Sequence, residues 1–306
     1  MKILVTGGKG VIGSALVRCL EGRGHEVWVC DLKHSHEERY IRCDVGKYRQ
    51  LLQVFEKQEY DLVYHLAAEF GRWNGEDYFE DLWVTNCIGT KNMLRLQEKY
   101  GFKMVFASSS EVYGDYRGLM REEVMDTEEI RQLNDYALSK WVNELQIMNA
   151  ERMSGSRTVR VRLFNTYGPG EYYTPYRSAI SIFAYKALHN LPYTVYLGHR
   201  RTSLYIDDCV ECLANIVDNF QAGEVYNLAG QELHDMKTVS DLVLEYLGKD
   251  DRLVNYVPEE KFTVRVKIPD NSKAVRFLGL NPRVGLREGI ARTVDWMREV
   301  YQPARV

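Results

Sequence analysis

A glycine-rich turn directly after the first apolar run constrains the fold of this chain more than any other feature. The run KILVT at 2–6 is followed by glycines in GxxGxxG spacing, and a segment with helical apolar periodicity, 12–24, comes next. Because glycine has no Cβ, the chain can turn tightly from strand to helix, and its backbone can approach a pyrophosphate bound by the free N–H groups of the helix N-terminus. An ordinary tight turn is the alternative for the glycines alone. The predicted cofactor cradle consists of Gly7, Gly10, Val11, Ile12 and Gly13.

Short apolar runs alternate with helix-like segments through the first half of the chain. Runs rich in Val, Ile and aromatic residues stand at 2–6, 26–30, 62–67, 103–109 and 159–164. Segments with one apolar stripe lie between them, at 12–24, 47–58 and 87–101. This alternation predicts a parallel sheet with crossover helices, whose strands are apolar because both faces are covered. The expected fold class is therefore α/β, with a Rossmann-type doubly wound parallel sheet and a smaller C-terminal domain.

The alternation of apolar runs and helix-like segments ends near Gly168. A loop rich in turn residues and tyrosine, GPGEYYTPYR, begins there. Helical and strand-like segments follow at 178–190, 194–198, 201–208, 237–248 and 286–301. We expect a nucleotide-binding Rossmann domain over 1–165, to which a strand near 224–229 returns. Residues 166–306 are expected to form mainly a substrate-binding domain.

The composition disfavours several classes of protein. The 306 residues carry a formal net charge of −3, so there is no polybasic field that would predict nucleic-acid binding. No run approaches the roughly 18 apolar residues of a membrane-spanning helix, and the N-terminal segment lacks the hydrophobic stretch of a signal peptide, which favours the cytoplasm. Only Cys209 and Cys212 among the six cysteines have CxxC spacing. No second pair completes a zinc site, so we expect buried reduced thiols and no metal.

Residues at the ends of the following strands extend the predicted cradle. Asp31 closes the run EVWVCD. Its carboxylate can accept hydrogen bonds from both hydroxyls of an adenine ribose and would repel a 2′-phosphate, which favours NAD over NADP. Lys33 and His34 follow closely and leave NADP as an alternative cofactor. A second alternative is that Asp31 is a plain turn residue that binds no cofactor. Further residues expected along the cofactor are Asp44, Val45, Leu66, Ala67 and Ala68.

Tyr136 and Lys140, in YALSK, lie one helical turn apart on the same face. An ammonium group favours the phenolate, so this tyrosine can act as a base near neutral pH. Together with TGGKGVIG, HLAA, VTNCIGT, SSSEVYG, RLFNTYGPG and RTSLYIDD, the motif resembles the extended short-chain dehydrogenase/reductase family of NAD-dependent nucleotide-sugar epimerases and dehydratases. The resemblance implies that Ser109 hydrogen-bonds the reacting hydroxyl while Tyr136 removes its proton. It also implies that Tyr136, Lys140 and Asn86 help to hold NAD.

In the family that the chain resembles, a 4-keto sugar forms first, hydride later returns from NADH, and the fate of the ketone defines the enzyme. Epimerases let the sugar turn, dehydratases eliminate the C6 hydroxyl, and decarboxylases lose the C6 carboxylate. Thymidine-type dehydratases have Thr-Asp-Glu where this chain has Ser109, Ser110 and Glu111. Ser110 therefore disfavours that subtype, whereas Glu111 favours C5/C6 chemistry over simple epimerisation. The alternative is that Glu111 only pairs with a nearby basic group.

The sequence thus favours an NAD-dependent epimerase or dehydratase, an isomerase or lyase, acting on an NDP-hexose or NDP-hexuronate. An NDP-uronic acid decarboxylase and a net NAD-dependent sugar-nucleotide dehydrogenase or reductase are alternatives. A sensor or scaffold protein that binds NAD is disfavoured, because Ser109, Tyr136 and Lys140 are all present. The resemblance also implies a homodimer, packed through the helix of Tyr136 and the helix after Asn86.

Basic and aromatic residues later in the chain are candidates for binding the sugar nucleotide. Arg201 heads RTSLYIDD, where the family has a diphosphate-binding arginine, and Asn165 matches a segment that contacts the substrate. Lys267 stands where the family usually has another arginine. The tyrosines of 171–177 could stack on a base, line the sugar pocket or merely pack. The predicted substrate-binding set is Glu69, Arg72, Asn165, Arg177, Arg201 and Arg265.

Overall fold

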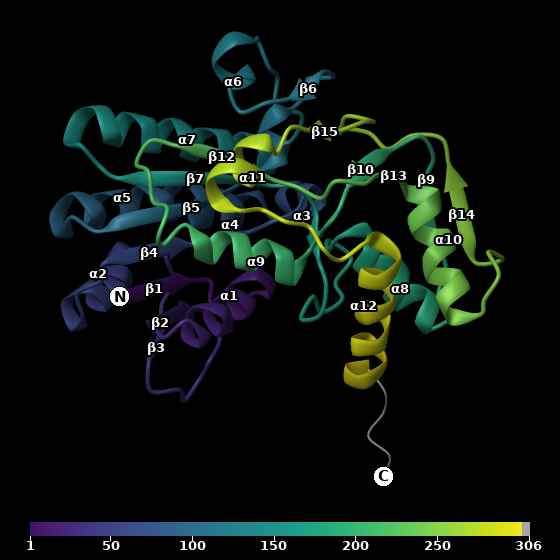
Figure 1. Ribbon diagram of the computed structural model, residues 1–306, viewed down its shortest axis with the longest axis horizontal. Coiled ribbons are helices and arrows are strands. Elements are labelled where there is room, and N and C mark those ends of the chain that lie inside the picture. The colour runs from purple at the N-terminus through teal and green to yellow at the C-terminus, as the bar shows by residue number, and fades with distance from the viewer. Residues whose placement is uncertain (302–306) are drawn as a thin grey trace.

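Seven parallel strands form the central sheet of the computed structural model, in the order β12–β7–β5–β4–β1–β2–β3 (Figure 1). Their bounds are β1 (Lys2–Thr6), β2 (Glu26–Asp31), β3 (Tyr40–Arg42), β4 (Leu62–His65), β5 (Lys103–Ser109), β7 (Thr158–Leu163) and β12 (Val225–Leu228). The structure describes residues 1–301, so 302–306 lie outside the described part. The predicted α/β fold with a doubly wound parallel sheet is confirmed. The strand expected near 224–229 is β12, which pairs with β7 at the sheet edge.

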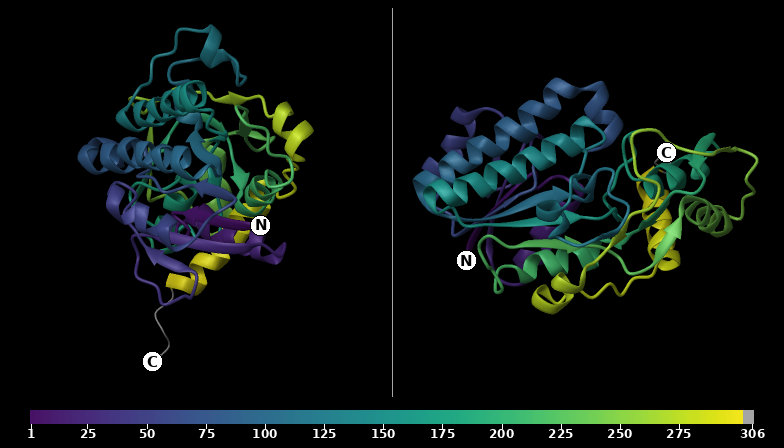
Figure 2. Two further views of the ribbon diagram at one scale, coloured as in Figure 1. Left: turned by 90° about the vertical axis from the view of Figure 1, so that its left-hand side faces the viewer. Right: turned by 90° about the horizontal axis from the view of Figure 1, so that it is seen from above.

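Helices cover both faces of the sheet (Figure 2). One face carries α1 (Val11–Gly22), α9 (Ile206–Asn215) and α11 (Ser272–Leu278). The other carries α2 (Tyr48–Lys57), the π-helix η1 (Val84–Ile88), α5 (Gly89–Tyr100) and α7 (Asp135–Ser154). Each helix buries its apolar stripe, as α1 does with Leu16 and Leu20 and α2 does with Leu51, Val54 and Phe55. This burial is the main source of stability in such a layered fold.

The parallel strands end at one common edge, which positions the site. In the register of the sheet, Thr6 on β1 lies opposite Cys30 on β2 and His65 on β4. Ser109, the last residue of β5, lies opposite Leu163 on β7. The strand order reverses between β1 and β4, and ligands of doubly wound sheets bind at such a switch point, outside the carboxyl ends of the strands.

A second group of elements lies beyond this edge, on the right in Figure 1. Its main members are α8 (Ala179–Leu188), α10 (Met236–Leu247), α12 (Leu286–Tyr301) and the parallel pair β9 (Tyr193–Tyr196) and β14 (Val254–Val257). Short strand pairs are β10 (Arg200–Thr202) with β13 (Leu233–Asp235), β11 (Leu204–Tyr205) with β8 (Thr166–Tyr167), and β15 (Ile268–Pro269) with β6 (Leu119–Met120). Short helices outside this group are α3 (Arg72–Asp77), α4 (Phe79–Trp83) and η2 (Ser110–Tyr113), which pack against α7, and α6 (Val124–Thr127).

One local expectation differs from the structure. The run at 201–208 is not one strand, because β10 and β11 are separate and α9 already begins at Ile206. Cys209 and Cys212 are buried with free thiols on α9, as expected for core cysteines. Within residues 1–301, no group of His, Cys, Asp or Glu side chains could hold a metal ion, and no helix is long and apolar enough to cross a membrane.

Candidate active site

A cavity of about 710 Å³ opens at the carboxyl edge of the sheet and extends to the second group of elements. This volume lies in the range of small-molecule and cofactor sites. The cavity is lined by all the residues predicted for catalysis and by most of those predicted for binding. They are Gly7, Gly10, Val11, Ile12, Gly13, Asp31, Asp44, Val45, Leu66, Ala67, Ala68, Glu69, Arg72, Ser109, Ser110, Glu111, Tyr136, Lys140, Asn165, Arg177 and Arg201.

The turn after β1 has the shape of a dinucleotide cradle. Gly7 adopts a φ of +69°, and a Cβ there would lie 2.8 Å from the backbone nitrogen of Ala67. A Cβ on Gly13 would lie only 2.2 Å from the carbonyl oxygen of Gly7. Gly10, the N-cap of α1, supplies no capping side chain, so the first N–H groups of the helix are available to an anion. This geometry fits the pyrophosphate of NAD.

Asp31 faces the same cavity from the end of β2. One carboxylate oxygen, Oδ2, accepts a hydrogen bond of 2.9 Å from the backbone N–H of Lys9, which fixes the carboxylate beside the glycine turn. Asn86 is placed differently from the other predicted cofactor residues, because it is buried and does not line the cavity. Its side chain bonds the N–H and carbonyl of Glu69 and the hydroxyl of Ser139. Asn86 therefore holds the backbone that leads into the cavity.

Ser109, Tyr136 and Lys140 converge at the end of β5 and the start of α7. The helix begins after Asn134, whose side chain accepts a hydrogen bond of 2.8 Å from Ala137 N–H. Lys140 is buried and donates to the Ala107 carbonyl at 2.8 Å, with its Nζ 5.9 Å from the centroid of the Tyr136 ring. Burial raises the pKa of Tyr136, and a hydrogen bond with Ser109 opposes this rise only in part, so the pKa is about 12. Burial lowers the pKa of Lys140 to about 8.

Glu111 lies on η2, immediately after β5, and pairs with a residue from far along the chain. Its Oε1 lies 2.5 Å from Lys267 Nζ, and Lys267 is only 2% exposed. Burial alone would raise the pKa of Glu111, but the Lys267 cation outweighs it and lowers this pKa to about 2. Glu111 is therefore a carboxylate near neutral pH. The predicted alternative of a basic partner for Glu111 matches this geometry, but no sequence signal joined the two residues.

The candidate substrate residues fall into two groups. Arg72, Arg177, Arg201, Asn165 and Glu69 line the cavity. Arg265 does not line it, since its guanidinium pairs at 2.7 Å with Glu259 on the surface. Arg177 lies 4.1 Å above the ring of Phe70, and its Nε is buried without a hydrogen-bond partner among the described residues. Arg72 pairs with Glu260 at 2.5 Å across the cavity.

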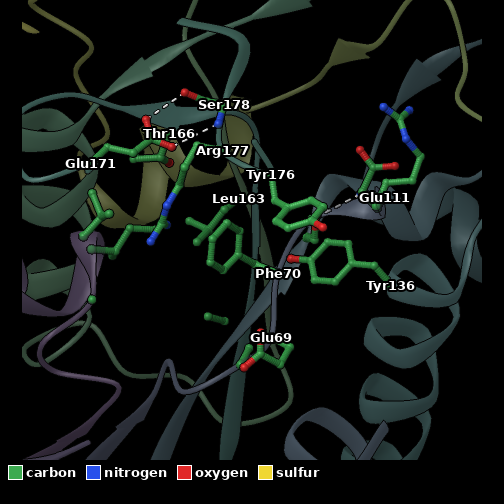
Figure 3. A pocket seen from close by; sticks show the side chains of 18 of the residues that line it. Glu69, Phe70, Glu111, Tyr136, Leu163, Thr166, Glu171, Tyr176, Arg177 and Ser178 are labelled. Atoms are coloured by element: carbon green, nitrogen blue, oxygen red, sulfur yellow. Dashed lines mark hydrogen bonds between the residues drawn. The ribbon is translucent and has the colours of Figure 1, made fainter. Parts of the chain in front are cut away.

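Sequence reasoning missed several residues of the cavity wall. Glu171 is buried and accepts hydrogen bonds from the Ser178 backbone N–H and hydroxyl at 3.1 and 2.7 Å. Figure 3 shows Glu171 and Arg177 on one side of the cavity and Glu111 and Tyr136 on the other. His199, Glu260 and Thr263 also line it, and they could not be found because no motif contains them.

Of the tyrosines in the 171–177 loop, only Tyr176 lines the cavity. Tyr173 stacks on Tyr185 with ring centroids 3.9 Å apart, and Tyr172 packs edge-on against Trp296 at 5.1 Å. For these two residues, packing is the role that the structure assigns.

Residues 3–229 match the model of the NAD dependent epimerase/dehydratase family. The chain belongs to this family. A UDP-glucuronic acid decarboxylase 6 of Arabidopsis thaliana is 32% identical to it, over 95% of this chain and 87% of the relative. A UDP-N-acetyl-alpha-D-glucosaminuronate decarboxylase of Bacillus cytotoxicus is 28% identical, over 98% of each. The structure of a Thermus thermophilus UDP-glucose 4-epimerase complexed with NAD superposes with a TM-score of 0.86 at 28% identity, covering 97% of this chain and 99% of that one.

Membership of the family confirms the predicted resemblance and establishes the activity at the level the family shares. The protein is an NAD-dependent enzyme of the nucleotide-sugar epimerase/dehydratase group, and NAD is its cofactor. The glycine turn and Asp31 supply the features that this cofactor requires.

Proposed function

We propose that the protein transiently oxidises C4 of an NDP-hexose or NDP-hexuronate and regenerates its NAD within one turnover, as an isomerase or lyase. The observation that carries this proposal is the convergence of Ser109, Tyr136, Lys140 and Glu111 beside the dinucleotide cradle in one cavity. An electron acceptor and a proton acceptor are then both within reach of one sugar carbon, which oxidation of an alcohol requires.

The roles of the side chains follow from their positions. Bound NAD supplies the reversible two-electron chemistry at C4. Tyr136 Oη is placed to accept the proton of the C4 hydroxyl. Burial opposes the phenolate and raises the pKa of Tyr136 to about 12, so this transfer needs the cation of Lys140, whose Nζ lies 5.9 Å from the ring centroid. Ser109 donates its hydroxyl to the substrate oxygen and keeps it beside Tyr136. Lys140 is buried, so little of its side chain is exposed to solvent.

A second candidate function within this mechanism is decarboxylation of an NDP-hexuronate. The guanidinium groups of Arg72 and Arg201 lie close enough to Glu111 to lower its pKa, so cations gather around this carboxylate in the cavity. Such cations would bind a uronate carboxylate. The decarboxylases among the relatives act, by their names, on glucuronic acid and glucosaminuronate derivatives, which supports the same choice.

The remaining predictions are proposals of the same kind. Residues 1–165 with β12 would hold NAD. Residues 166–306 would mainly bind the sugar nucleotide, through Arg177 and Arg201, together with Glu69, Arg72 and Asn165 from the first domain. We further propose a homodimer, since exposed apolar side chains recur on η1 and on the outer face of α7: Val84, Ile88, Leu138 and Leu145. A cytoplasmic location is supported by free thiols at all six cysteines.

The test is a product assay with NAD and a panel of UDP-, GDP-, dTDP- and CDP-sugars that includes uronic acids, read by mass spectrometry and NMR. A product isobaric with its substrate and inverted at one carbinol centre means epimerisation. Loss of water or of carbon dioxide means a lyase, and decarboxylation is expected only with uronates. Stoichiometric accumulation of free NADH would contradict the proposal, because it would indicate a net dehydrogenase.

A further inference from the structure

A lysine from the C-terminal part of the chain reaches the catalytic end of the cavity from behind. Lys267 precedes β15 and is 156 positions from Glu111, whose Oε1 it contacts at 2.5 Å. Lys267 Nζ also lies 3.5 Å from the hydroxyl of Ser110. Lys267 does not itself line the cavity, whereas Glu111 does. The lysine can therefore act on the substrate only indirectly, through Glu111 and through the longer contact with Ser110, both of which line the cavity.

The backbone around Lys267 is fixed on both sides. Its N–H donates to the Arg200 carbonyl at 3.1 Å, and Arg200 N–H donates to the Arg265 carbonyl at 2.7 Å. The next two residues form β15, which pairs with β6, and Asp270 N–H donates to Met120 at 3.0 Å. A side chain that starts from such an anchored strand and is buried has few other positions, so the contact with Glu111 is built into the fold.

Other charged groups face Glu111, but each has a different partner or role. Arg72, from α3, is paired with Glu260 at 2.5 Å. Arg201, from β10, donates to main-chain carbonyls, including that of Val264 at 2.6 Å. Tyr136, from α7, is the group whose pKa the Glu111 charge raises. Among the described residues, the only ion pair made by Glu111 is the one with Lys267.

The pairing treats the two oxygens of Glu111 differently. Oε1 is occupied by the ammonium group, whereas Oε2 has no hydrogen-bond partner among residues 1–301. One oxygen is thus anchored while the other is available to a ligand in the cavity. An ionised carboxylate with one free oxygen can accept a hydrogen bond or a proton from a ligand there, and the Lys267 charge keeps it ionised while making it a weaker base.

On these contacts we propose that Lys267 is a positioning residue that anchors the Glu111 carboxylate as a proton acceptor on the sugar side of Tyr136. The proposal deepens the proposed function and rests on it for the identity of the sugar substrate. The lysine at this position then has a definite chemical role. The ammonium group neutralises Glu111 from behind the cavity wall, where it takes no part in binding the diphosphate.

The test compares Lys267→Met and Lys267→Gln, which remove the charge, with Lys267→Arg, which keeps it. The first readout needs no turnover: carboxyl carbons of 13C-glutamate-labelled protein are titrated by NMR, and Glu111→Gln identifies the Glu111 signal. In the unaltered protein, Glu111 should stay ionised down to about pH 3. In the neutral variants its pKa should rise by about one to three units, as expected on loss of an adjacent cation. Thermal unfolding of each variant establishes that it is folded.

The second readout is the pH profile of turnover with the substrate found in the product assay. Because Glu111 must be ionised to accept a proton, activity is lost as the pH falls through its pKa, so the acid limb should move to higher pH in the neutral variants. Lys267→Arg should keep the limb near its original place. An unchanged Glu111 titration in both folded neutral variants would overturn the proposal, as would an unmoved acid limb. If no sugar nucleotide is turned over, the proposed function fails while the titration still decides the pairing.

Discussion

The buried charge cluster beneath the active site offers the sharpest quantitative prediction. Glu144, on α7 one turn after Lys140, is 0% exposed and accepts hydrogen bonds from Arg162 Nε and Nη2 at 3.0 and 2.8 Å. Ser108 and Arg160 donate to the same carboxylate at 2.5 and 3.3 Å. Arg162→Met would keep much of the apolar volume but leave the buried carboxylate with the Ser108 hydroxyl and only the weaker arginine contact, that of Arg160.

Breaking a buried ion pair by removing one partner typically costs about 3–5 kcal/mol, because the remaining charge is uncompensated. Arg160 still neutralises part of the Glu144 charge, so we expect a loss near 3 kcal/mol in the free energy of unfolding of Arg162→Met at pH 7.5. For a chain of this size, that corresponds to a decrease in Tm of roughly 6 °C.

The loss should depend on pH. Burial tends to raise the pKa of Glu144, but Arg162 outweighs this effect and holds the pKa below its usual value. A pKa lowered by folding stabilises the protein above the unfolded-state value of roughly 4.3, and this contribution is lost as the pH falls below it. In Arg162→Met the pKa of Glu144 rises instead. As the pH falls, Glu144 of the variant is protonated, and the cost of its uncompensated buried charge is removed. The difference between the two proteins should be largest above pH 7 and shrink toward pH 5.

Urea unfolding followed by circular dichroism at pH 5, 6 and 7.5 measures this difference. The control is the double variant Glu144→Leu with Arg162→Met, which removes both charges and should recover at least half of the loss, since apolar replacement of a buried pair is often nearly neutral. A cost below about 1 kcal/mol for Arg162→Met, or one that is the same at every pH, would refute the reasoning.

Three further predictions concern the cofactor and the chemistry. Tyr136→Phe should lower turnover by about 10²–10⁴-fold, measured by product assay, with a much smaller loss of NAD affinity, measured by calorimetry; near-normal turnover would contradict its role as the base. Gly13→Ala should weaken NAD binding at least tenfold, because its Cβ would lie 2.2 Å from the Gly7 carbonyl oxygen. Gly22→Ala on the same helix meets no atom within 4 Å and should bind NAD normally; equal affinities would contradict the cradle. Asp31→Ser should narrow the preference for NAD over NADP in fluorescence titrations, and an unchanged preference would argue against ribose recognition by Asp31.

The sequence by itself determined the sheet and the order of the site along it. Strand runs and glycine spacing depend on local physics, namely alternation, helix periodicity and the need for close backbone approach, so β1, β2, β5 and the cradle at Gly7–Gly13 were predictable. Tyr136 and Lys140 were found for the same reason, because their pairing is one turn of a single helix.

Only the tertiary structure decided which distant side chains complete the site. Lys267 meets Glu111 because β15 docks on β6. Arg265, two positions earlier, points instead to a surface partner. Asn86 lies behind the cavity wall, although it stands in a motif that predicted a residue in contact with the cofactor. These contacts join residues far apart in the chain, and no local periodicity encodes them. They depend on how packed elements orient each side chain, which only the folded chain fixes.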